Sequence, residues 1–314
     1  MLGPVADPWA VILAGGAGTR RRALTRRIAG DERPKQFCRL VDGETMIDRT
    51  RRRAEWVVRP DRHVVVVTAD HAGYFGALPL ELAPGRLVVQ PCNRGTLVGL
   101  LYPILRVVDL AGDAPVVILP SDHDLAEEPA FMDQVAQALE VVRALPERLV
   151  LLGIEPEGPE VEYGWIEPGP VPPEAEGPVV FGVRRFWEKP TPALVRALYA
   201  RRCLWNSFVM VGWASTVLAV ARRAAPDVWQ DLAPLRRALG TRREPAVARR
   251  VSQRLPALSF SAHVLVRMVD RLLVLPVKDV GWADWGHPQR VLASLERRGC
   301  RPGWLEPLEL APPA

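Results

Sequence analysis

The sequence predicts an α/β fold with a doubly wound, mostly parallel but mixed sheet. In the first half of the chain, short apolar runs rich in β-branched residues alternate with longer segments of helical periodicity. Such alternation is typical of parallel strands joined by crossover helices. With 314 residues, of which 48% are hydrophobic and 25% charged, the chain is long and apolar enough to bury one large core.

The elements of the first half follow from this periodicity. Helices are predicted where apolar residues recur at helical spacing, at 44–58, 95–108 and 128–145. Pro129 is suited to the first turn of the last of these helices. The predicted strands are the short apolar runs, which lie at 9–14, 63–68, 87–90, 115–119 and 149–154.

The second half of the chain has a different composition, with more proline and glycine at its start. Prolines and glycines crowd residues 155–178, which predicts long loops or a hairpin over the sheet. We expect one domain over 1–300, in two halves at about 9–150 and 151–300, followed by a proline-rich tail at 301–314. The remaining predicted elements are strands at 179–187, 206–212 and 271–277 and a helical region at 214–254.

Composition narrows the class of protein. The net charge of +5 suits a polyanionic ligand, but no basic patch with interleaved aromatic residues occurs, so we expect no nucleic-acid partner. The four cysteines are scattered without metal-ligand spacing, which fits reduced thiols in the cytoplasm. The N-terminus lacks a signal pattern, and polar residues interrupt the uncharged stretch 204–221. We therefore expect a cytoplasmic protein without a membrane partner.

A glycine-rich turn follows the first predicted strand. Gly15, Gly16 and Gly18 lack Cβ atoms, so the backbone can turn sharply and approach a ligand closely. Successive N–H groups of such a loop can bind an anion, and Arg20 and Lys35 add cations suited to phosphate. The pattern predicts a cradle for a triphosphate. The alternative is an ordinary strand-to-helix turn with solvated arginines, whereas the spacing excludes Walker A and dinucleotide-binding motifs.

Two segments place a carboxylate after a strand or in a loop. Asp122 follows the strand at 115–119, where a carboxylate can hold Mg²⁺ together with substrate phosphates. As an alternative, Asp122 is a turn or helix-capping residue. Asp284 lies in the segment Gly-Trp-Ala-Asp-Trp-Gly, which by itself predicts only a turn with packed tryptophans, and spacing does not exclude nearby Asp279 in its place.

The segment 90–96, Gln-Pro-Cys-Asn-Arg-Gly-Thr, follows a strand and opens a helix. Its amide side chains and the helix N-terminus offer the donors and acceptors that a nucleobase edge requires. The alternative is ordinary helix capping by Asn93 or Thr96.

In this order and spacing the motifs closely resemble those of sugar-nucleotide pyrophosphorylases, most of all mannose-1-phosphate guanylyltransferases. That family has Leu-Ala-Gly-Gly-x-Gly-Thr-Arg followed by Pro-Lys-Gln-Phe, as at Leu13–Arg20 and 34–37 here. The resemblance covers about residues 11–291. It implies a Rossmann-like or GT-A-like nucleotidyltransferase domain without a C-terminal isomerase or β-helix domain. The chain departs from the family after Arg20, where an arginine-rich segment stands, and at Ser261 and Val266, where the family has acidic residues.

The resemblance also assigns roles to individual residues. It makes Arg20 and Lys35 catalytic and Asp122 and Asp284 the ligands of Mg²⁺. The sugar-phosphate residues implied by the segments 162–166, 187–190 and 205–207 are Tyr163, Gly164, Glu188, Lys189 and Asn206. The implied nucleotide-binding residues are Ala14, Gly15, Gly16, Gly18, Thr19, Gln90, Asn93, Gly95 and Thr96.

The implied reaction joins a sugar 1-phosphate to a nucleoside triphosphate and releases pyrophosphate, with mannose 1-phosphate and GTP as the favoured pair. A sugar phosphate is already an anionic nucleophile at neutral pH, which agrees with the lack of any Ser/His/Asp or Cys/His constellation. A homodimer is a possible assembly. Two other classes stay open. One is a glycosyltransferase that uses Asp122-His123-Asp124 as an Asp-x-Asp metal motif, and the other is a non-catalytic sensor of nucleotide-sugars.

Overall fold

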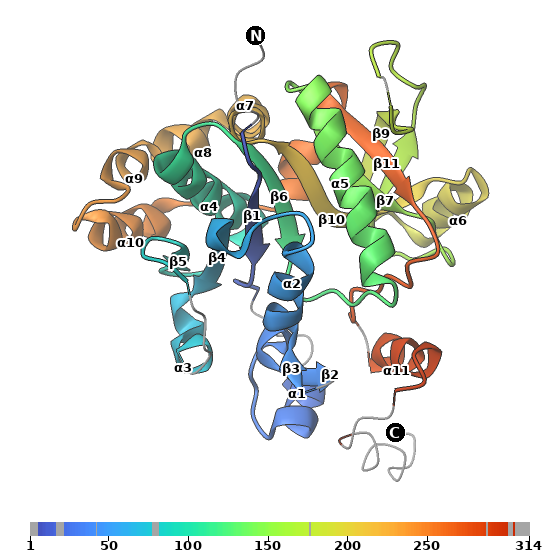
Figure 1. The fold of residues 1–314 in the computed structure, drawn as a ribbon, viewed down its shortest axis with the longest axis horizontal. Helices are drawn as coiled ribbons and strands as arrows, with labels where there is room; N and C mark the ends of the chain where they lie inside the picture. The colour runs from blue at the N-terminus through green and yellow to red at the C-terminus, as the bar shows by residue number, and fades with distance from the viewer. Residues whose placement is uncertain are drawn as a thin grey trace.

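The computed structural model describes residues 6–16, 22–41, 43–76, 82–175, 177–286, 288–300 and 304. Its centre is a nine-stranded sheet flanked by helices on both faces (Figure 1). Along the sheet the strands are β5 (Leu87–Gln90), β4 (His63–Thr68), β1 (Trp9–Leu13), β6 (Pro115–Pro120), β10 (Leu204–Trp213), β7 (Leu149–Ile154), β11 (Leu272–Val277), β9 (Phe181–Glu188) and β8 (Gly164–Pro168).

The predicted mostly parallel, mixed sheet is confirmed. Strands β5, β4, β1 and β6 form a parallel block, and β7 and β11 form a parallel pair. Between them β10 runs antiparallel to both β6 and β7, and β9 runs antiparallel to β11 and β8. The mixed character therefore comes from two reversed strands, both in the second half of the chain.

The central strands β1, β4, β6 and β7 are buried on both faces, and their side chains alternate between two cores. Val11 and Val66 pack into one hydrophobic cluster, whereas Ile12 and Val65 pack into the other. This period of two is the geometry of a strand covered on both sides. It explains why these strands have continuous apolar sequences rather than alternating apolar and polar residues.

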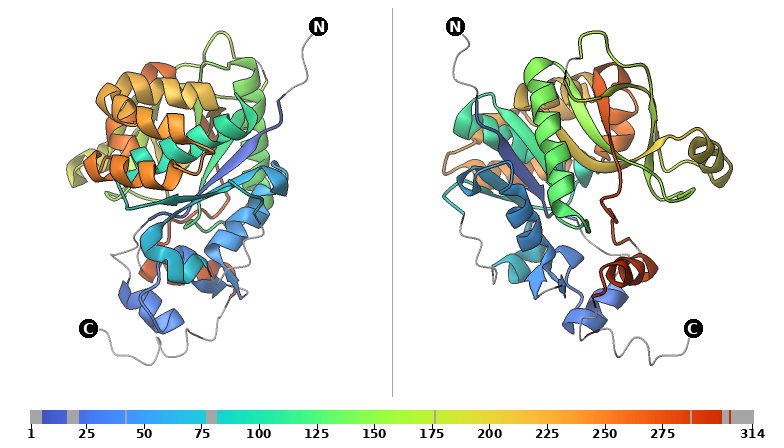
Figure 2. Two further views of the ribbon diagram at one scale, coloured as in Figure 1. Left: turned by 90° about the vertical axis from the view of Figure 1, so that its left-hand side faces the viewer. Right: turned by 45° about the vertical axis from the view of Figure 1, so that its right-hand side comes forward.

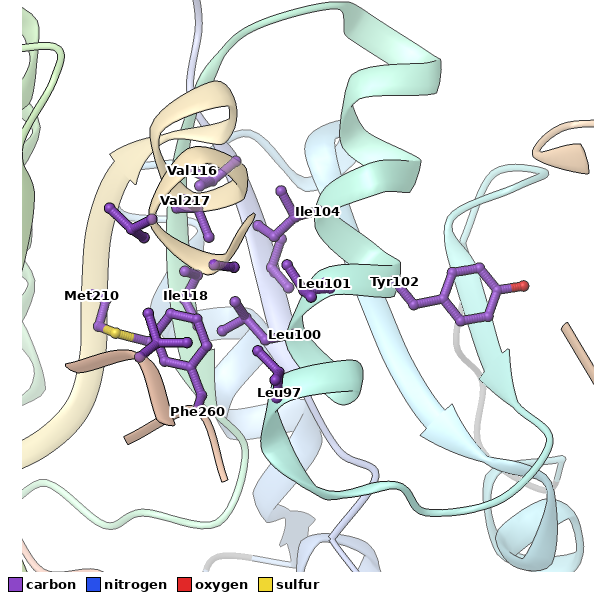
Figure 3. Packing of buried hydrophobic residues seen from close by; sticks show 14 of the residues in the cluster. Leu97, Leu100, Leu101, Tyr102, Ile104, Val116, Ile118, Met210, Val217 and Phe260 are labelled. Carbon is purple, nitrogen blue, oxygen red and sulfur yellow. The ribbon is translucent and has the colours of Figure 1, made fainter. Parts of the chain in front are cut away.

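Helices of the second half cover one face of the sheet together with α4 (Gly95–Ala111). Figure 3 shows Leu97, Leu100 and Ile104 of α4 packed against β6, β10 and α7, while Tyr102, of the same buried cluster, lies on the opposite side of α4. The prediction of one helical region at 214–254 is refined into separate helices, because Pro226, Pro234 and Pro245 each lie in the first turn of a new helix. These helices are α7 (Ala214–Ala224), α8 (Pro226–Asp231), α9 (Ala233–Ala238) and α10 (Glu244–Arg254).

The opposite face is covered by α2 (Met46–Ala54), α5 (Glu128–Ala144) and α6 (Pro192–Ala200). Below the sheet a small lobe contains α1 (Arg22–Ala29), the hairpin β2 (Arg39–Val41) and β3 (Glu44–Thr45), and α11 (Pro288–Arg297) (Figure 2). A third hydrophobic cluster, which includes Leu40, Trp285 and Leu295, joins the segment 38–46 to the segment 283–295 within this lobe.

Some elements differ from the sequence-based expectations. For residues 155–178 the sequence predicted either long loops or a hairpin. This region contains β8, which pairs with β9 in antiparallel fashion, so the structure has the hairpin. The short helix α3 (Ala72–Phe75), the β2–β3 hairpin, α1, α6 and α11 were not predicted. None of the described helices has the length and apolar character required to cross a lipid bilayer.

Candidate active site

The carboxyl ends of the parallel strands meet at one edge of the sheet. Gly15 follows β1, Gln90 ends β5, and Asp122 follows β6. The segment after β11 reaches the same edge, because an isolated β-bridge joins Asp124 to Ala283, with N···O distances of 2.8 and 3.0 Å. Ligands of open α/β sheets bind at this edge, so the predicted residues lie where the topology favours a site.

A cavity of about 150 Å³ lies between the loop after β1 and the N-terminus of α4. Ala14 is buried beside it, and its backbone N–H donates to Val66. Three further residues predicted in this loop, Gly18, Thr19 and Arg20, lie outside the described residues. The cavity is lined by six of the predicted nucleotide-binding residues, Gly15, Gly16, Gln90, Asn93, Gly95 and Thr96, and by Leu13, Val66 and Gly99.

Side-chain hydrogen bonds hold this loop in shape. The Thr68 hydroxyl and the Asn93 amide both donate to the Gly15 carbonyl, at 2.9 and 3.3 Å. The Gln36 amide donates to the Ala14 and Gly16 carbonyls, at 3.0 and 2.9 Å. These bonds fix the described start of the loop, residues 14–16, without any bound ligand. Sequence reasoning missed Thr68 and Gln36, although Gln36 stands beside Lys35 in the predicted motif.

Glycine is required at Gly15 and Gly95 for space. A Cβ on Gly15 would lie 2.8 Å from the Gln90 amide nitrogen and 3.1 Å from the Thr68 hydroxyl. At Gly95 φ is +74°, and a Cβ would collide with the backbone of Leu258. The segment at Leu258 caps α4 from outside, since the Leu258 carbonyl accepts a hydrogen bond from Leu97.

We expect Gly95→Ala to destabilise the protein by about 2–4 kcal/mol, because left-handed strain of about 1–3 kcal/mol is joined by a backbone collision. Gly30→Ala is the matched control, since Gly30 has a φ of +78° but open space around its Cβ position. Urea unfolding of both variants measures the difference. Equal losses would show that the close approach of Leu258 contributes nothing.

Lys35 and the two predicted metal carboxylates converge on one point. Lys35 is only 4% exposed, and its Nζ lies 3.1 Å from Asp122 Oδ2 and donates to the backbone carbonyl of Asp284. The three residues come from distant parts of the chain and from three different elements. The structure thus brings together one cation and two carboxylates beside the glycine-rich loop.

Asp284 is held by a network of donors. Its Oδ1 accepts hydrogen bonds from the Tyr163 hydroxyl at 2.9 Å, from Gly286 N–H at 2.7 Å and from Arg290 at 2.8 Å. Burial raises the pKa of Asp284, but the cations Lys35 and Arg290 outweigh burial and bring the pKa down to about 2. Asp284 is therefore ionised at neutral pH. Arg290, on α11, was not predicted, and no local motif marks it.

The two residues after Asp122 have different surroundings: His123 Nε2 lies 3.6 Å from Asp122 Oδ1, at the edge of the site, whereas the Asp124 side chain points into the protein. His123 lies against Trp282 with ring centroids 5.2 Å apart, and burial lowers its pKa to about 4, so it is neutral. The Asp124 side chain has no exposed surface and pairs with Arg49 and Arg298. An Asp-x-Asp motif at 122–124 would need both carboxylates at the metal, and Asp124 is engaged elsewhere.

The carboxylates fit Mg²⁺ as part of a site that substrate completes. Among the described residues no group of three or more His, Cys, Asp or Glu side chains could enclose a metal. Asp122 and Asp284 nevertheless both lie near the Lys35 ammonium, which pairs with the Asp122 carboxylate, donates to the Asp284 backbone carbonyl and lowers the pKa of Asp284. Mg²⁺ commonly takes one or two protein carboxylates and fills its other positions with water and phosphate. This donor set matches that pattern.

The predicted sugar-phosphate residues gather at the adjoining end of β8, β9 and β10. A Cβ built on Gly164 would lie 3.2 Å from Glu188 Oε2 and 3.3 Å from Asn206 Cβ, so these three residues are in contact. Burial raises the pKa of Glu188, against the opposing effects of Lys189 and of a hydrogen bond from Ser261. Lys189 is exposed and has a left-handed backbone, with φ of +47°.

A bulge in β10 presents Asn206. The register with β7 shifts between Asn206 and Met210, and Phe208 adopts a φ of +59°. The side-chain oxygen Oδ1 of Asn206 accepts a hydrogen bond from Phe208 N–H at 3.1 Å, and the Ser207 hydroxyl donates to the Leu152 backbone carbonyl at 2.6 Å. Bulges commonly redirect a side chain beside a site. A larger cavity, of about 530 Å³ and lined by Tyr102 and Arg106, contains none of the predicted residues.

Comparison with known proteins agrees with this geometry. The model of the family described as nucleotidyl transferase matches residues 9–293. The xanthan biosynthesis protein XanB of Xanthomonas campestris pv. campestris is 30% identical over 310 residues, which are 94% of this chain and 61% of that protein. The mannose-1-phosphate guanylyltransferase ManC of Salmonella typhimurium is 30% identical over 285 residues, or 88% of this chain and 57% of that protein.

A solved structure from Thermus thermophilus, described as a mannose-1-phosphate geranyltransferase, superimposes with a TM-score of 0.75. It is 25% identical to this chain, and the match covers 94% of this chain and 80% of that one. The chain thus spans about three fifths of the two curated relatives and most of the solved structure.

Proposed function

This chain belongs to the nucleotidyl transferase family, and on that basis we propose that it joins a sugar 1-phosphate to a nucleoside triphosphate, releasing pyrophosphate. The observation that carries the proposal is the convergence of Lys35, Asp122 and Asp284 beside the glycine-lined cavity. Transfer of a charged phosphoryl group requires cations that neutralise its charge, carboxylates that can hold a metal ion, and backbone N–H groups that bind the phosphates.

The reaction is a displacement at the α-phosphorus. An oxygen of the sugar phosphate forms the new bond to that phosphorus, and the bond to the leaving pyrophosphate breaks with its electron pair. Because the nucleophile is already an anion, no side chain must remove a proton. The protein's contribution is to align the two phosphates and to neutralise charge. Mg²⁺ would be held by Asp122 and Asp284 and would supply further charge neutralisation at the phosphate oxygens.

Each group of residues has a distinct task in this proposal. The backbone at Gly15 and Gly16 binds the triphosphate, and Gln90 and Asn93 bind the base. Glu188 and Asn206 bind sugar hydroxyls, for which the half-buried carboxylate of Glu188 is a strong acceptor. Lys35, together with Arg20 from the adjoining loop, stabilises charge on the transferred group.

We further propose mannose 1-phosphate and GTP as the substrates, on the basis of relatives named mannose-1-phosphate guanylyltransferase. Incubation of the protein with each of the four nucleoside triphosphates and with several hexose 1-phosphates tests the pairing, with released pyrophosphate as the readout. We expect pyrophosphate only when both substrates are present. Sugar transfer from a nucleotide-sugar to an acceptor, without pyrophosphate, would instead support the glycosyltransferase alternative.

The sugar and nucleotide sides should be separable by mutation. We expect Glu188→Gln and Asn206→Ala to raise the KM for sugar 1-phosphate by about tenfold, because each loses a polar contact worth about 1–2 kcal/mol. Triphosphate affinity, measured by calorimetry, should stay nearly unchanged. Glu167→Gln on β8 is the matched control, since Glu167 pairs with Arg201 at 2.7 Å outside the predicted site. A large loss of triphosphate affinity in the first two variants would contradict the assignment.

A further inference from the structure

Asp124 makes an unusual set of contacts for a residue that has no role in the proposed reaction. Its side chain is fully buried, and its Oδ1 lies 3.3 Å from both Arg49 on α2 and Arg298 just after α11. The Ser294 hydroxyl of α11 donates to its Oδ2 at 2.5 Å. A carboxylate without exposed surface is stable only when cations and hydrogen bonds replace its hydration, and here both guanidinium groups and a hydroxyl do so.

The backbone of Asp124 links the two segments that carry the predicted metal carboxylates. Asp124 stands two residues after Asp122, and it exchanges two backbone hydrogen bonds with Ala283, the residue directly before Asp284. No other isolated bridge occurs among the residues that the structure describes. Together with the hydrogen bonds that Ala126 and Glu127 donate to the Val280 carbonyl, this bridge holds the two carboxylate-bearing segments side by side.

The side chain of Asp124 is also connected to Asp284, through residues of helix α11. Ser294 lies one helical turn after Arg290 on α11, and Arg290 donates to Asp284 Oδ1 at 2.8 Å. Anchoring Ser294 and Arg298 on Asp124 thus fixes the helix that presents Arg290. Besides its contacts with Tyr163 and Lys35, Asp284 is thus linked to Asp124 in two ways, through the Ala283 bridge and through α11.

We propose that Asp124 is a positioning residue that sets the separation of Asp122 and Asp284. The separation matters for catalysis only if the proposed function is right, and in that respect this inference rests on the proposed function. The positioning of the two carboxylates is itself a property of the fold. Without the Asp124 carboxylate, Arg49 retains Glu128 and Arg298 retains the Leu125 carbonyl, but the negative charge between the two guanidinium groups is lost and Ser294 loses its acceptor. The anchoring of α11 is then weaker, and we expect the segment 280–286, with Asp284, to be held less rigidly.

Hydrogen exchange of Ala283 and Gly286 amides tests the positioning directly, without metal or substrate. In the Asp124→Asn variant we expect these two amides to exchange with solvent at least about tenfold faster than in the wild-type protein. In Ser294→Ala, the milder variant, the increase in exchange rate should be smaller. Glu244→Gln is the matched control. Glu244 is another largely buried carboxylate, which accepts from Tyr102 at 2.7 Å and pairs with Arg106, but it belongs to α10 on the other side of the sheet.

A second readout is the affinity for Mn²⁺ alone, measured by electron paramagnetic resonance. Loss of a residue that orients metal ligands commonly weakens binding about 10- to 100-fold, and we expect this for Asp124→Asn but not for Glu244→Gln. Unchanged exchange at Ala283 in both Asp124→Asn and Ser294→Ala would overturn the proposal. If wild-type protein binds no Mn²⁺, the metal assignment fails, while the exchange data still decide whether Asp124 positions the segment.

Discussion

Replacing Asp122 or Asp284 with asparagine is expected to lower turnover by about 10²-fold or more, because each change removes a charge that a divalent cation needs at the reacting phosphates. Asn keeps the shape of the side chain, so the loss reports charge rather than packing. Asp284 is ionised at neutral pH, with a pKa of about 2, and its charge is therefore present throughout the working range. Steady-state pyrophosphate release at saturating substrates measures the effect.

Asp279→Asn is the matched control for this pair. Asp279 is exposed in the same segment and has a φ of +55°, a backbone conformation that asparagine tolerates well. We expect this variant to keep wild-type turnover, which would also exclude Asp279 as the second metal ligand. Full activity of the wild-type protein in excess chelator would contradict the metal assignment altogether.

Lys35→Met is expected to lower kcat by about 10²–10³, on the order of 3–4 kcal/mol, with a smaller change in the KM for triphosphate. Methionine keeps much of the side-chain length and deletes the charge. The glycine loop already offers contacts to the bound triphosphate, whereas charge on the phosphoryl oxygens builds up only as the bond to pyrophosphate breaks. The Lys35 ammonium, which is held in place by burial beside Asp122, stabilises this charge most strongly at that stage of the reaction.

Lys278→Met serves as its control, since Lys278 is exposed and lies 3.8 Å from Glu155. It should leave both kinetic constants unchanged. A steep rise in KM for Lys35→Met with unchanged kcat would make Lys35 a binding residue rather than a catalytic one.

The sequence by itself determined the central sheet and most of the site's composition. Runs such as 63–68 and 115–119 are apolar on both faces of a strand, and this pattern needs no tertiary information. Gly15, Gln90 and Asp122 lie at ends of such strands, so the edge of the sheet at which they meet was also predictable. The motifs around Lys35 and Asp284 were visible as residue patterns, although their proximity was not.

Tertiary structure alone decided the short and reversed elements. Strand β8 has only five residues and lies in a proline-rich region, and its pairing with β9 and β10 rather than its own propensity makes it a strand. The helix α11 is likewise amphipathic but brief, and it is held by a cluster that joins residues near 40 to residues near 295.

The environment of the carboxylates also needed the fold. Nothing near Asp124 in sequence distinguishes a metal ligand from a buried ion pair, since its partners are Arg49, Ser294 and Arg298. The same is true of Asp284 and Arg290, whose interaction depends on the direction of α11. Residue patterns specify which groups are available. The charge, burial and spacing of those groups arise only when distant segments pack together, because electrostatic energies depend on distance and on exclusion of water.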